Sequence, residues 1–450
     1  MNLRDLQNKK IALLGLGVEN YALLKFLLKK KVKAHFIVCD LRGAAALGDK
    51  FQELNRFDNV VWQLGKEFNQ KLERYDILFR SPGWPLFCSG VQTAQKLSKQ
   101  ITVTSPMKLF FALCPTKNII GVTGTKGKGT TASLIYNILK TGGKRAWLGG
   151  NIGVAPFVFI DKIKKGDWVV LELSSFQLED LDKSPNIAVL TNFTPEHLAS
   201  ADPHNPNFHR NLSDYLKAKV NIARWQKSGD YFVMNDKLRG RILNFEFGIL
   251  NKIKSKKIYF TASNLLSKLP GEHNKENIAA AEAAAEIIGI KKNIVARAVK
   301  NFKGLEHRLE LVKDAKGVKY YDDSFATTPE SAIIALKSFS APVILLAGGA
   351  DKGSDFKNFA KEIKKRVKFV CLLKGQATPR LKQVITKAGL IKSQVKEFSD
   401  INQAVKTAAR QAERGDIVLL STACASFGMF ANYKQRGDLF KRAVKRLLKR

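Results

Sequence analysis

The sequence has no long apolar run, few cysteines and few acidic residues for its length. No segment approaches the roughly 18 apolar residues that a membrane-spanning helix needs, which argues against an integral membrane protein. The first ten residues are polar and lead directly into a strand-like segment, so the sequence predicts no secretory signal peptide. The five cysteines are scattered and form no Cys-x-x-Cys pair, which is typical of reduced thiols in a cytoplasmic protein.

Acidic residues number 39 against 76 lysines and arginines, which gives a formal net charge of +37. Such a charge can indicate a nucleic-acid-binding protein. The basic residues are spread along the whole chain, however, and no helix-turn-helix, zinc-finger or RNA-binding signature accompanies them. Two explanations stay open: a lysine bias on solvated surfaces, or attraction of anionic substrates or surfaces. We expect no nucleic-acid partner.

The 450 residues predict about three domains, at roughly 100–200 residues per domain. Buried-strand patterns alternate with helical patterns in three successive units, which favours an α/β protein with parallel sheets. Strands are expected at residues 9–17, 35–40, 75–83, 118–124, 168–175, 186–194, 317–324, 342–350, 368–375 and 416–426. Helices are expected at residues 18–31, 130–140, 277–289 and 439–450, and the proline-containing stretch 104–117 is expected to be a boundary segment.

The segment GVTGTKGKGT, residues 121–130, stands between an apolar strand and a helix. In such a glycine-rich turn the backbone N–H groups can cradle phosphate oxygens, and the helix N-terminus adds a partial positive charge. Lys128 is placed to reach the β- and γ-phosphates of a nucleotide. The spacing departs from the standard phosphate loop, because Val122 replaces its first glycine and Gly129 replaces its metal-binding hydroxyl residue. The context nevertheless predicts nucleotide binding rather than a glycine turn that only starts a helix.

This loop resembles the ATP loop of the Mur ligases, a family that includes folylpolyglutamate synthase relatives. Other segments resemble motifs of the same family, in the same order: GGNIG (149–153), LELSSFQLE (171–179), LTNFTPEHL (190–198), YLKAKVNI (215–222), GEHNKENIAAA (271–281), LEHRLE (305–310), DDSFATTP (322–329), GGADKG (348–353) and STACASFGMFANYKQRG (421–437). LELSSFQLE is most similar to the members that add D-glutamate. The resemblance implies three domains in series: a Rossmann-like domain for UDP (1–105), a central P-loop-type ATPase domain (106–304) and a Rossmann-like C-terminal domain for the amino acid (305–450).

The resemblance implies an ATP-dependent ligase that adds D-glutamate to UDP-N-acetylmuramoyl-L-alanine during peptidoglycan synthesis. ATP would phosphorylate the muramoyl-alanine carboxylate to an acyl phosphate, which the amine of D-glutamate attacks. Such phosphoryl transfer needs positioning and charge neutralisation, and two Mg²⁺ ions are expected beside ATP. We expect a cytoplasmic monomer. Two alternatives remain: a Mur-type ligase for another amino acid, and a weakened homologue that only binds nucleotides or anionic polymers.

The same resemblance assigns site residues. The catalytic residues are expected to be Lys128, Glu172, His197 and Lys219, of which Lys219 matches a lysine that is carbamylated in the family. Metal ligands are expected at Thr130, Glu172, His197 and Lys219. ATP contacts are expected from Gly124, Thr125, Lys126, Gly127, Lys128, Gly129, Thr130, Asn274, Asn277, Arg308 and Asp323. Substrate contacts are expected from Gly17, Asp40, Arg42, Ser81, Gly83, Asn151, Thr327, Lys352, Ser426 and Tyr433.

Five of these residues also have a plainer interpretation. Glu172 could be a buried ion-pair partner, His197 a structural histidine, Lys219 one more exposed lysine, and Asn274 and Asn277 helix caps. Their residue types nevertheless suit the expected chemistry, since carboxylate oxygens bind Mg²⁺ and an arginine fork such as that of Arg308 matches phosphate oxygens.

Five positions depart from the family pattern. Gly129 removes a metal-binding hydroxyl, and Phe325 replaces a lysine. Ala199 and Ser200 replace an acidic residue and an arginine before an enlarged loop (200–212), and Tyr433 stands where a phenylalanine is usual.

The final helix has one apolar face, formed by Leu439, Phe440, Ala443, Val444, Leu447 and Leu448. This face could lie on an anionic membrane, but we expect it to dock on its own domain.

Overall fold

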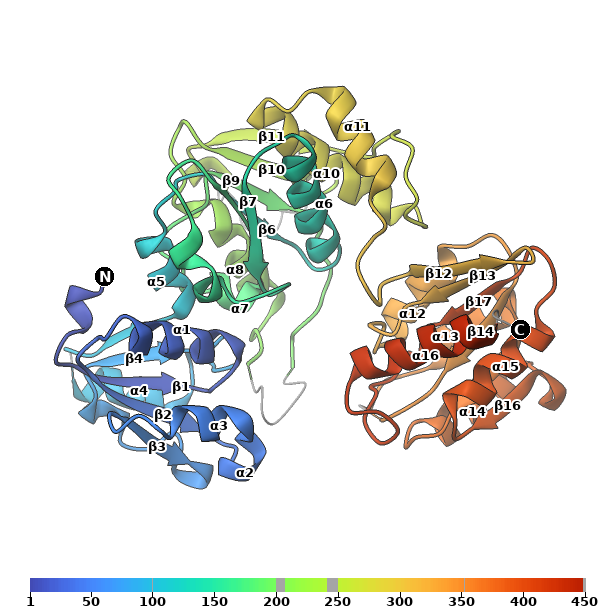
Figure 1. The fold of residues 1–450 in the computed structure, drawn as a ribbon, viewed down its shortest axis with the longest axis horizontal. Helices are drawn as coiled ribbons and strands as arrows, with labels where there is room; N and C mark the ends of the chain where they lie inside the picture. The colour runs from blue at the N-terminus through green and yellow to red at the C-terminus, as the bar shows by residue number, and fades with distance from the viewer. Residues whose placement is uncertain (99, 200–206, 241–249, 352, 448–450) are drawn as a thin grey trace. The chain divides into compact units, whose positions relative to one another are not determined.

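The computed structural model describes the chain except for residues 99, 200–206, 241–249, 352 and 448–450. The described residues form three sheets, mainly parallel, with helices packed on them (Figure 1). They fall into two compact units, Met1–Leu265 with Glu276–Val299, and Leu266–Lys275 with Lys300–Arg450. The predicted α/β class with parallel sheets is therefore confirmed, whereas the three domain boundaries stay a prediction.

The first sheet has five parallel strands in the order β3-β2-β1-β4-β5. The strands are β1 (Lys10–Leu14), β2 (His35–Asp40), β3 (Val60–Leu64), β4 (Ile77–Arg80) and β5 (Thr102–Thr104). Ile11 and Leu13 pack in the core cluster that contains α1 (Val18–Lys29), whereas Ala12 and Leu14 pack in the cluster that contains α4 (Ser89–Leu97). Helices thus cover both faces, and the strand order reverses between β1 and β4, where such sheets bind ligands.

The second sheet has six parallel strands in the order β11-β10-β9-β6-β8-β7. The strands are β6 (Ile119–Thr123), β7 (Ala146–Gly150), β8 (Trp168–Glu172), β9 (Ile187–Leu190), β10 (Tyr231–Asn235) and β11 (Lys256–Phe260). β6 is central and lies between β8 and β9, so the segment that follows it has neighbouring strand ends on both sides. The predicted phosphate loop is this segment.

The stretch 104–117 is more than the expected boundary, because it contains the helix α5 (Pro106–Leu113). Ser105 caps this helix by accepting a hydrogen bond from the Lys108 backbone N–H at 3.3 Å. Pro106 occupies the first turn, where the absence of an N–H group costs nothing. Phe110 is fully buried in the core. The proline that suggested a linker is therefore a helix-starting residue.

The third sheet forms the centre of the second unit, in the order β12-β13-β17-β14-β15-β16. Its strands are β12 (Glu310–Ala315), β13 (Val318–Asp322), β14 (Val343–Ala347), β15 (Val367–Leu373), β16 (Val395–Phe398) and β17 (Ile417–Leu420). The pair β12–β13 is antiparallel, and the other strand pairs are parallel. Ile344 and Leu346 face one core cluster and Val343 and Leu345 face the other, so this sheet is also buried on both sides.

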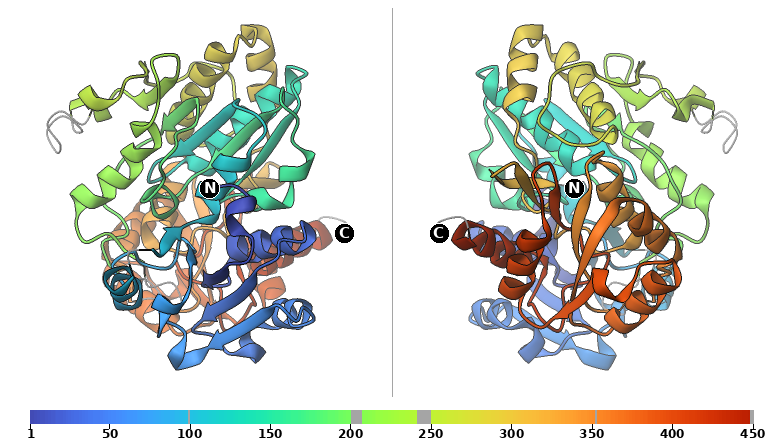
Figure 2. Two further views of the ribbon diagram at one scale, coloured as in Figure 1. Left: turned by 90° about the vertical axis from the view of Figure 1, so that its left-hand side faces the viewer. Right: turned by 90° about the vertical axis from the view of Figure 1, so that its right-hand side faces the viewer.

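The remaining helices connect these strands. They are α2 (Ala44–Leu47), α3 (Asp49–Leu54), α6 (Lys128–Thr141), α7 (Ser175–Leu178), α8 (Leu212–Arg224), α10 (His273–Ile288), α11 (Lys292–Asn301), α12 (Pro329–Lys337), α13 (Lys357–Arg366), α14 (Thr378–Lys387), α15 (Ile401–Gln411) and α16 (Tyr433–Leu447). Figure 2 shows the ribbon from two further sides, with α10 and α11, in yellow, beside each other.

The last helix, α16, begins at Tyr433 rather than at the expected Leu439. Asn432 starts it early, because its Oδ1 accepts a hydrogen bond from the Gln435 backbone N–H at 3.0 Å. Phe440, Ala443 and Val444 are buried in the core cluster of the third sheet. This part of the apolar face therefore docks on its own domain, while Leu448 lies outside the described residues. Among the helices described, none is long and apolar enough to cross a membrane.

The first two sheets belong to one unit because a continuous core joins them. The same cluster contains Leu23 and Leu27 of α1 and Val169 and Leu171 of β8. A buried ion pair adds to this junction: the guanidinium of Arg80, at the end of β4, lies 2.9 Å from Asp180 and also donates to the Phe176 carbonyl at 3.0 Å. The side chain of Arg80 is 1% exposed.

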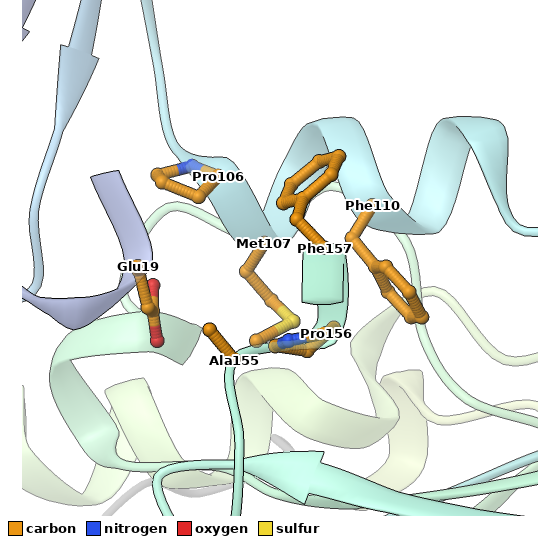
Figure 3. A pocket seen from close by; sticks show the side chains of 7 residues that line it. All are labelled: Glu19, Pro106, Met107, Phe110, Ala155, Pro156 and Phe157. Atoms are coloured by element: carbon orange, nitrogen blue, oxygen red, sulfur yellow. The ribbon is translucent and has the colours of Figure 1, made fainter. Parts of the chain in front are cut away.

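Glu19, in the first turn of α1, is a second polar group at this junction. Figure 3 shows its carboxylate beside a small apolar recess that is lined by Pro106, Met107, Phe110, Ala155, Pro156 and Phe157. Its Oε1 accepts a hydrogen bond from Gln177, and its Oε2 has no hydrogen-bond partner among the described residues. Burial raises the pKa of Glu19 to about 7, against the opposing influence of Gln177 and Arg80.

This raised pKa predicts a pH-dependent contribution to stability. Glu19 ionises near pH 4.5 in the unfolded chain and near pH 7 in the folded protein. The free energy of unfolding therefore falls as the pH rises from 4.5 to 7, by on the order of 3 kcal/mol in total. Below pH 4.5 both states are protonated and the cost is absent. Glu19→Gln should therefore raise the melting temperature at pH 8, with the gain shrinking as the pH approaches 4.5. Melting curves across this range, with the exposed Glu67→Gln as control, test this; an equal gain at every pH would contradict it.

Candidate active site

Gly124 and Gly127 shape the loop between β6 and α6. Their φ angles are 149° and 79°, in the region that favours glycine. A Cβ atom on Gly124 would lie 2.0 Å from Thr191 Oγ1, and one on Gly127 would lie 2.0 Å from Asn277 Oδ1. Both glycines are therefore required by conformation and by space. Asn277, expected to contact ATP, lies directly against the loop.

The segment that follows β9 braces this loop from the side. The Lys126 backbone N–H donates to Asn192 Oδ1 at 2.8 Å, and the Thr191 hydroxyl donates to the Lys126 carbonyl at 2.7 Å. The Thr125 hydroxyl lies 3.1 Å from the carbonyl of Thr194, whose own N–H donates back to it at 3.0 Å. In this structure Asn192 and Thr194 therefore fix the loop conformation.

Three lysines lie around the loop. Lys128, half-buried, donates to the Thr125 carbonyl at 3.0 Å, and Lys126 pairs with Glu196 at 2.5 Å. The Nζ of Lys219, on α8, donates to the Gly124 carbonyl at 2.7 Å. Lys219 is 1% exposed, so its interpretation as one more exposed lysine is wrong. Burial and then the charge of Lys128 hold the pKa of Lys219 well below its ordinary value, which favours an uncharged amine.

Glu172 and His197 come from the chain at and after β8 and β9, the two strands that flank β6. Glu172 ends β8 and is 3% exposed, and its Oε1 accepts a hydrogen bond from Asn151 Nδ2 at 3.0 Å. His197 has a left-handed φ angle of 60°, and its Nε2 lies 3.7 Å from Glu196 Oε2. Burial lowers the pKa of His197, although the charge of Glu196 opposes this. The charges of Glu172 and Glu196 also act on Lys219, so these groups share one electrostatic environment.

The sequence did not single out three residues that complete this environment: Glu196, His209 and Tyr215. The ring of His209 stacks on Phe176, with centroids 4.8 Å apart, and its Nε2 lies 2.9 Å from the Ser175 hydroxyl. Burial and the charge of Lys219 lower the pKa of His209 to about 4.

Tyr215 connects α8 to the loop. Its hydroxyl lies 3.2 Å from Thr125 Oγ1, and its ring centroid lies 4.4 Å from Lys219 Nζ. Tyr215 and Lys219 are four residues apart on one helix, and this spacing would have allowed their contact to be predicted from the sequence. Glu196 could have been noticed beside His197. His209 carries no comparable signal, because it belongs to a segment that the sequence showed only as an enlarged loop.

In the first sheet, Asp40 is the last residue of β2, which pairs with β1. Its Oδ2 accepts a hydrogen bond from the Leu16 backbone N–H at 2.7 Å and lies 2.8 Å from the Arg42 guanidinium. Although burial acts in the opposite direction, hydrogen bonds from Arg42 and Leu16 hold the pKa of Asp40 below its ordinary value. Asn20, in the first turn of α1, is fully buried and donates to the carbonyls of Leu14, Gly15 and Phe79. The predicted UDP residues at these strand ends are Gly17, Asp40, Arg42, Ser81 and Gly83.

The second unit contains other residues that were predicted to contact ATP or substrate. Asp323, directly after β13, accepts hydrogen bonds from the Ser421 hydroxyl at 2.7 Å and the Leu309 backbone N–H at 3.2 Å. Burial raises the pKa of Asp323 to about 7. Asn274 Nδ2 donates to the Pro270 carbonyl at 2.7 Å at the start of α10. The same unit contains Arg308, Thr327, Ser426 and Tyr433, and Lys352 lies outside the described residues.

Comparisons with known proteins show which family the chain belongs to. The Mur ligase middle domain matches residues 122–285, and the Mur ligase glutamate ligase domain matches residues 307–424. Two full-length relatives are both named UDP-N-acetylmuramoylalanine--D-glutamate ligase. The one from Acetivibrio thermocellus is 36% identical over 473 residues, which cover 98% of this chain and 97% of the relative. The one from Clostridium tetani is 37% identical over 464 residues, with the same coverage.

The chain therefore belongs to the Mur ligase family. Within the family, its full-length similarity is to the D-glutamate ligases, as the sequence motifs predicted. Among solved structures it is similar to the UDP-N-acetylmuramate-alanine ligase MurC of Thermotoga maritima, with a TM-score of 0.58, 17% identity, and coverage of 98% of this chain and 100% of that one. The MurF ligase of the same organism, in complex with ADP, gives a TM-score of 0.56 at 16% identity, covering 99% and 97%. These structures show a shared fold.

Proposed function

We propose that the protein adds D-glutamate to UDP-N-acetylmuramoyl-L-alanine, at the expense of ATP, during peptidoglycan precursor synthesis. The observation that carries this proposal is the similarity to ligases of that name along 98% of the chain. The buried Lys219 beside the loop, and the loop that Asn192 braces at the end of β6, support this proposal. The proposal includes a cytoplasmic, monomeric enzyme.

In this proposal, the loop from Gly124 to Thr130 holds the phosphates of ATP. Its backbone N–H groups and the start of α6 favour anions. Lys128 neutralises charge on the phosphoryl group that is transferred. Asn277 lies against Gly127 and would fix the loop around the nucleotide. Asn274, Arg308 and Asp323 are proposed to reach ATP as well.

The proposed metal ligands are Thr130, Glu172, His197 and a carbamylated Lys219. Thr130, Glu172 and a carbamylated Lys219 would offer oxygen atoms, which magnesium prefers, and the charge of Glu172 acts on Lys219. The metal, two ions in this proposal, would supply charge neutralisation for phosphoryl transfer. Gly129, which replaces the usual hydroxyl residue, is buried in the first turn of α6. That leaves Thr130, half-buried, as the proposed hydroxyl ligand.

A carbamate on Lys219 requires an uncharged amine. The amine nitrogen attacks the carbon of CO₂ and loses a proton, which leaves a carbamate anion. The lowered pKa of Lys219 supports this step, because a larger share of the buried amine is then unprotonated. The modification would also replace this amine with an anion that has two oxygens near the loop.

The reaction itself joins the two remaining substrates. A carboxylate oxygen of UDP-N-acetylmuramoyl-L-alanine attacks the γ-phosphorus of ATP, ADP leaves, and the amine of D-glutamate then displaces phosphate from the acyl phosphate. Gly17, Asp40, Arg42, Ser81 and Gly83 are proposed to hold the UDP end and Asn151 the muramoyl end. Thr327, Lys352, Ser426 and Tyr433 are proposed to hold D-glutamate, whose carboxylates suit a cation and hydroxyl donors.

Phosphate release by the purified protein tests this function. We expect release that requires ATP, UDP-N-acetylmuramoyl-L-alanine and D-glutamate together, and that stops when any one is omitted. A panel of D- and L-amino acids separates the alternatives. Preference for another amino acid would indicate a different Mur-type ligase, and no release with any of them would indicate a homologue that only binds nucleotides.

A further inference from the structure

Phe325 is a large apolar side chain in an exposed position. It follows Asp323 and Ser324 at the end of β13, and 39% of its surface is accessible to solvent. Its neighbours Asp322, Asp323 and Ser324 are all buried. Exposing a single phenylalanine is not unusual by itself, so its contacts decide whether it has a role.

Two side chains pack on the ring of Phe325. The Cζ atom of Arg308 lies 3.8 Å from the ring centroid, which is within the range of a cation–π stack. Tyr433 meets the same ring edge to face, with centroids 5.0 Å apart and planes at 88°. Phe325 is thus the middle member of a stack that joins Arg308 to the start of α16.

The backbone beneath this stack is held firmly. The Phe325 backbone N–H donates to the His307 carbonyl at 3.0 Å, next to Arg308. The Ser324 hydroxyl donates to the Tyr433 carbonyl at 2.8 Å. Arg436, fully buried, donates to the Ser324 hydroxyl at 2.9 Å and to its carbonyl at 2.7 Å. The segments that carry Arg308, Phe325 and Tyr433 are therefore fixed relative to one another.

An arginine side chain loses much rotational freedom when it binds an anion, and a surface that holds the guanidinium beforehand reduces that loss. An aromatic ring can hold the guanidinium in this way and leave its positive charge available to attract an anion, whereas a carboxylate would neutralise that charge. We infer that Phe325 is a positioning residue, which stacks Arg308 so that its guanidinium is oriented for the phosphates of ATP before the nucleotide binds. This inference rests on the proposed function, because it takes Arg308 as an ATP contact.

Three substitutions at one position test the stack. Phe325→Tyr keeps the ring, Phe325→Leu removes it but keeps an apolar side chain, and Phe325→Lys places a second cation beside Arg308. We expect Phe325→Leu to raise the dissociation constant and the KM for ATP by about threefold to tenfold. Phe325→Lys should raise them further, while Phe325→Tyr should match the wild type. The value of kcat should change by less than about twofold in the leucine and tyrosine variants, since the stack acts on nucleotide binding.

The double variant of Phe325→Leu with Arg308→Ala distinguishes positioning from a general structural effect. If Phe325 acts through Arg308, the leucine substitution has no further effect on ATP binding once Arg308 is absent. The same fold-change in both backgrounds, or no change with leucine alone, overturns the inference. Calorimetric binding of ATP to the full chain needs neither of the other substrates. Failure of D-glutamate to support phosphate release would therefore refute the proposed function alone, whereas unchanged ATP binding by Arg308→Ala would refute this inference.

Discussion

Replacing Lys128 with alanine should reduce D-glutamate-dependent phosphate release by about a thousandfold or more. Lys128 is half-buried at the start of α6, beside the loop that is proposed to hold ATP. Phosphoryl transfer depends on neutralising charge as it shifts, and a single well-placed cation can contribute about 10³-fold to the rate. The measurement is kcat and kcat/KM for ATP in the purified variant.

Lys140→Ala is a matched control, because Lys140 is exposed on the same helix. It should leave the rate within about twofold of the wild type, as surface substitutions usually have small effects. Both variants should melt close to the wild-type temperature. Full activity of Lys128→Ala would mean that the loop does not act on the transferred phosphoryl group.

Gly124→Ala should weaken ATP binding by about a hundredfold. The added Cβ would lie 2.0 Å from Thr191 Oγ1, and 3.1 and 3.2 Å from the backbone N and O of Asn192. Thr191 cannot move away without losing its hydrogen bond to the Lys126 carbonyl. The φ angle of 149° adds strain for any residue with a side chain. Together these costs reach roughly 3 kcal/mol, and each 1.4 kcal/mol corresponds to a tenfold change in affinity.

Gly143→Ala separates backbone strain from the clash. Gly143 also has a positive φ angle, of 74°, but no atom lies within 4 Å of the Cβ that it would carry. It is exposed after the end of α6. We expect a small fall in melting temperature and unchanged ATP binding. Calorimetry with ATP on both variants decides the point, and equal affinities would show that the loop tolerates a side chain at Gly124.

The sequence predicts most of the buried strands because their signal is local, although β10 (Tyr231–Asn235), which is mostly buried, was not predicted. The apolar runs at 35–40, 168–175 and 342–350 contain β2, β8 and β14, and the glycine loop after β6 is recognisable from its neighbours alone. The antiparallel pair β12–β13 has less apolar alternation, since every residue of β12 is exposed or half-buried. Only β13 was expected there.

The residues around the loop could be predicted only in part, because contacts between distant segments fix them. Thr125 and Tyr215 are 90 positions apart, as their hydroxyl contact shows. The low pKa of Lys219 arises from burial, which cannot be inferred for one lysine among many. Its role as a carbamate, the metal ligands and the domain boundaries stay predictions. The stack of Arg308 on Phe325 was also not foreseeable, because the motif indicated only a departure from the family pattern.

Oxygen transfer from the substrate carboxylate to phosphate tests the central claim most directly. UDP-N-acetylmuramoyl-L-alanine with ¹⁸O in its alanyl carboxylate is incubated with the protein, ATP and D-glutamate, and the released phosphate is analysed by mass spectrometry. Activation through an acyl phosphate predicts that each phosphate carries one oxygen atom from that carboxylate. Amide product formed together with phosphate that contains no ¹⁸O would contradict the account.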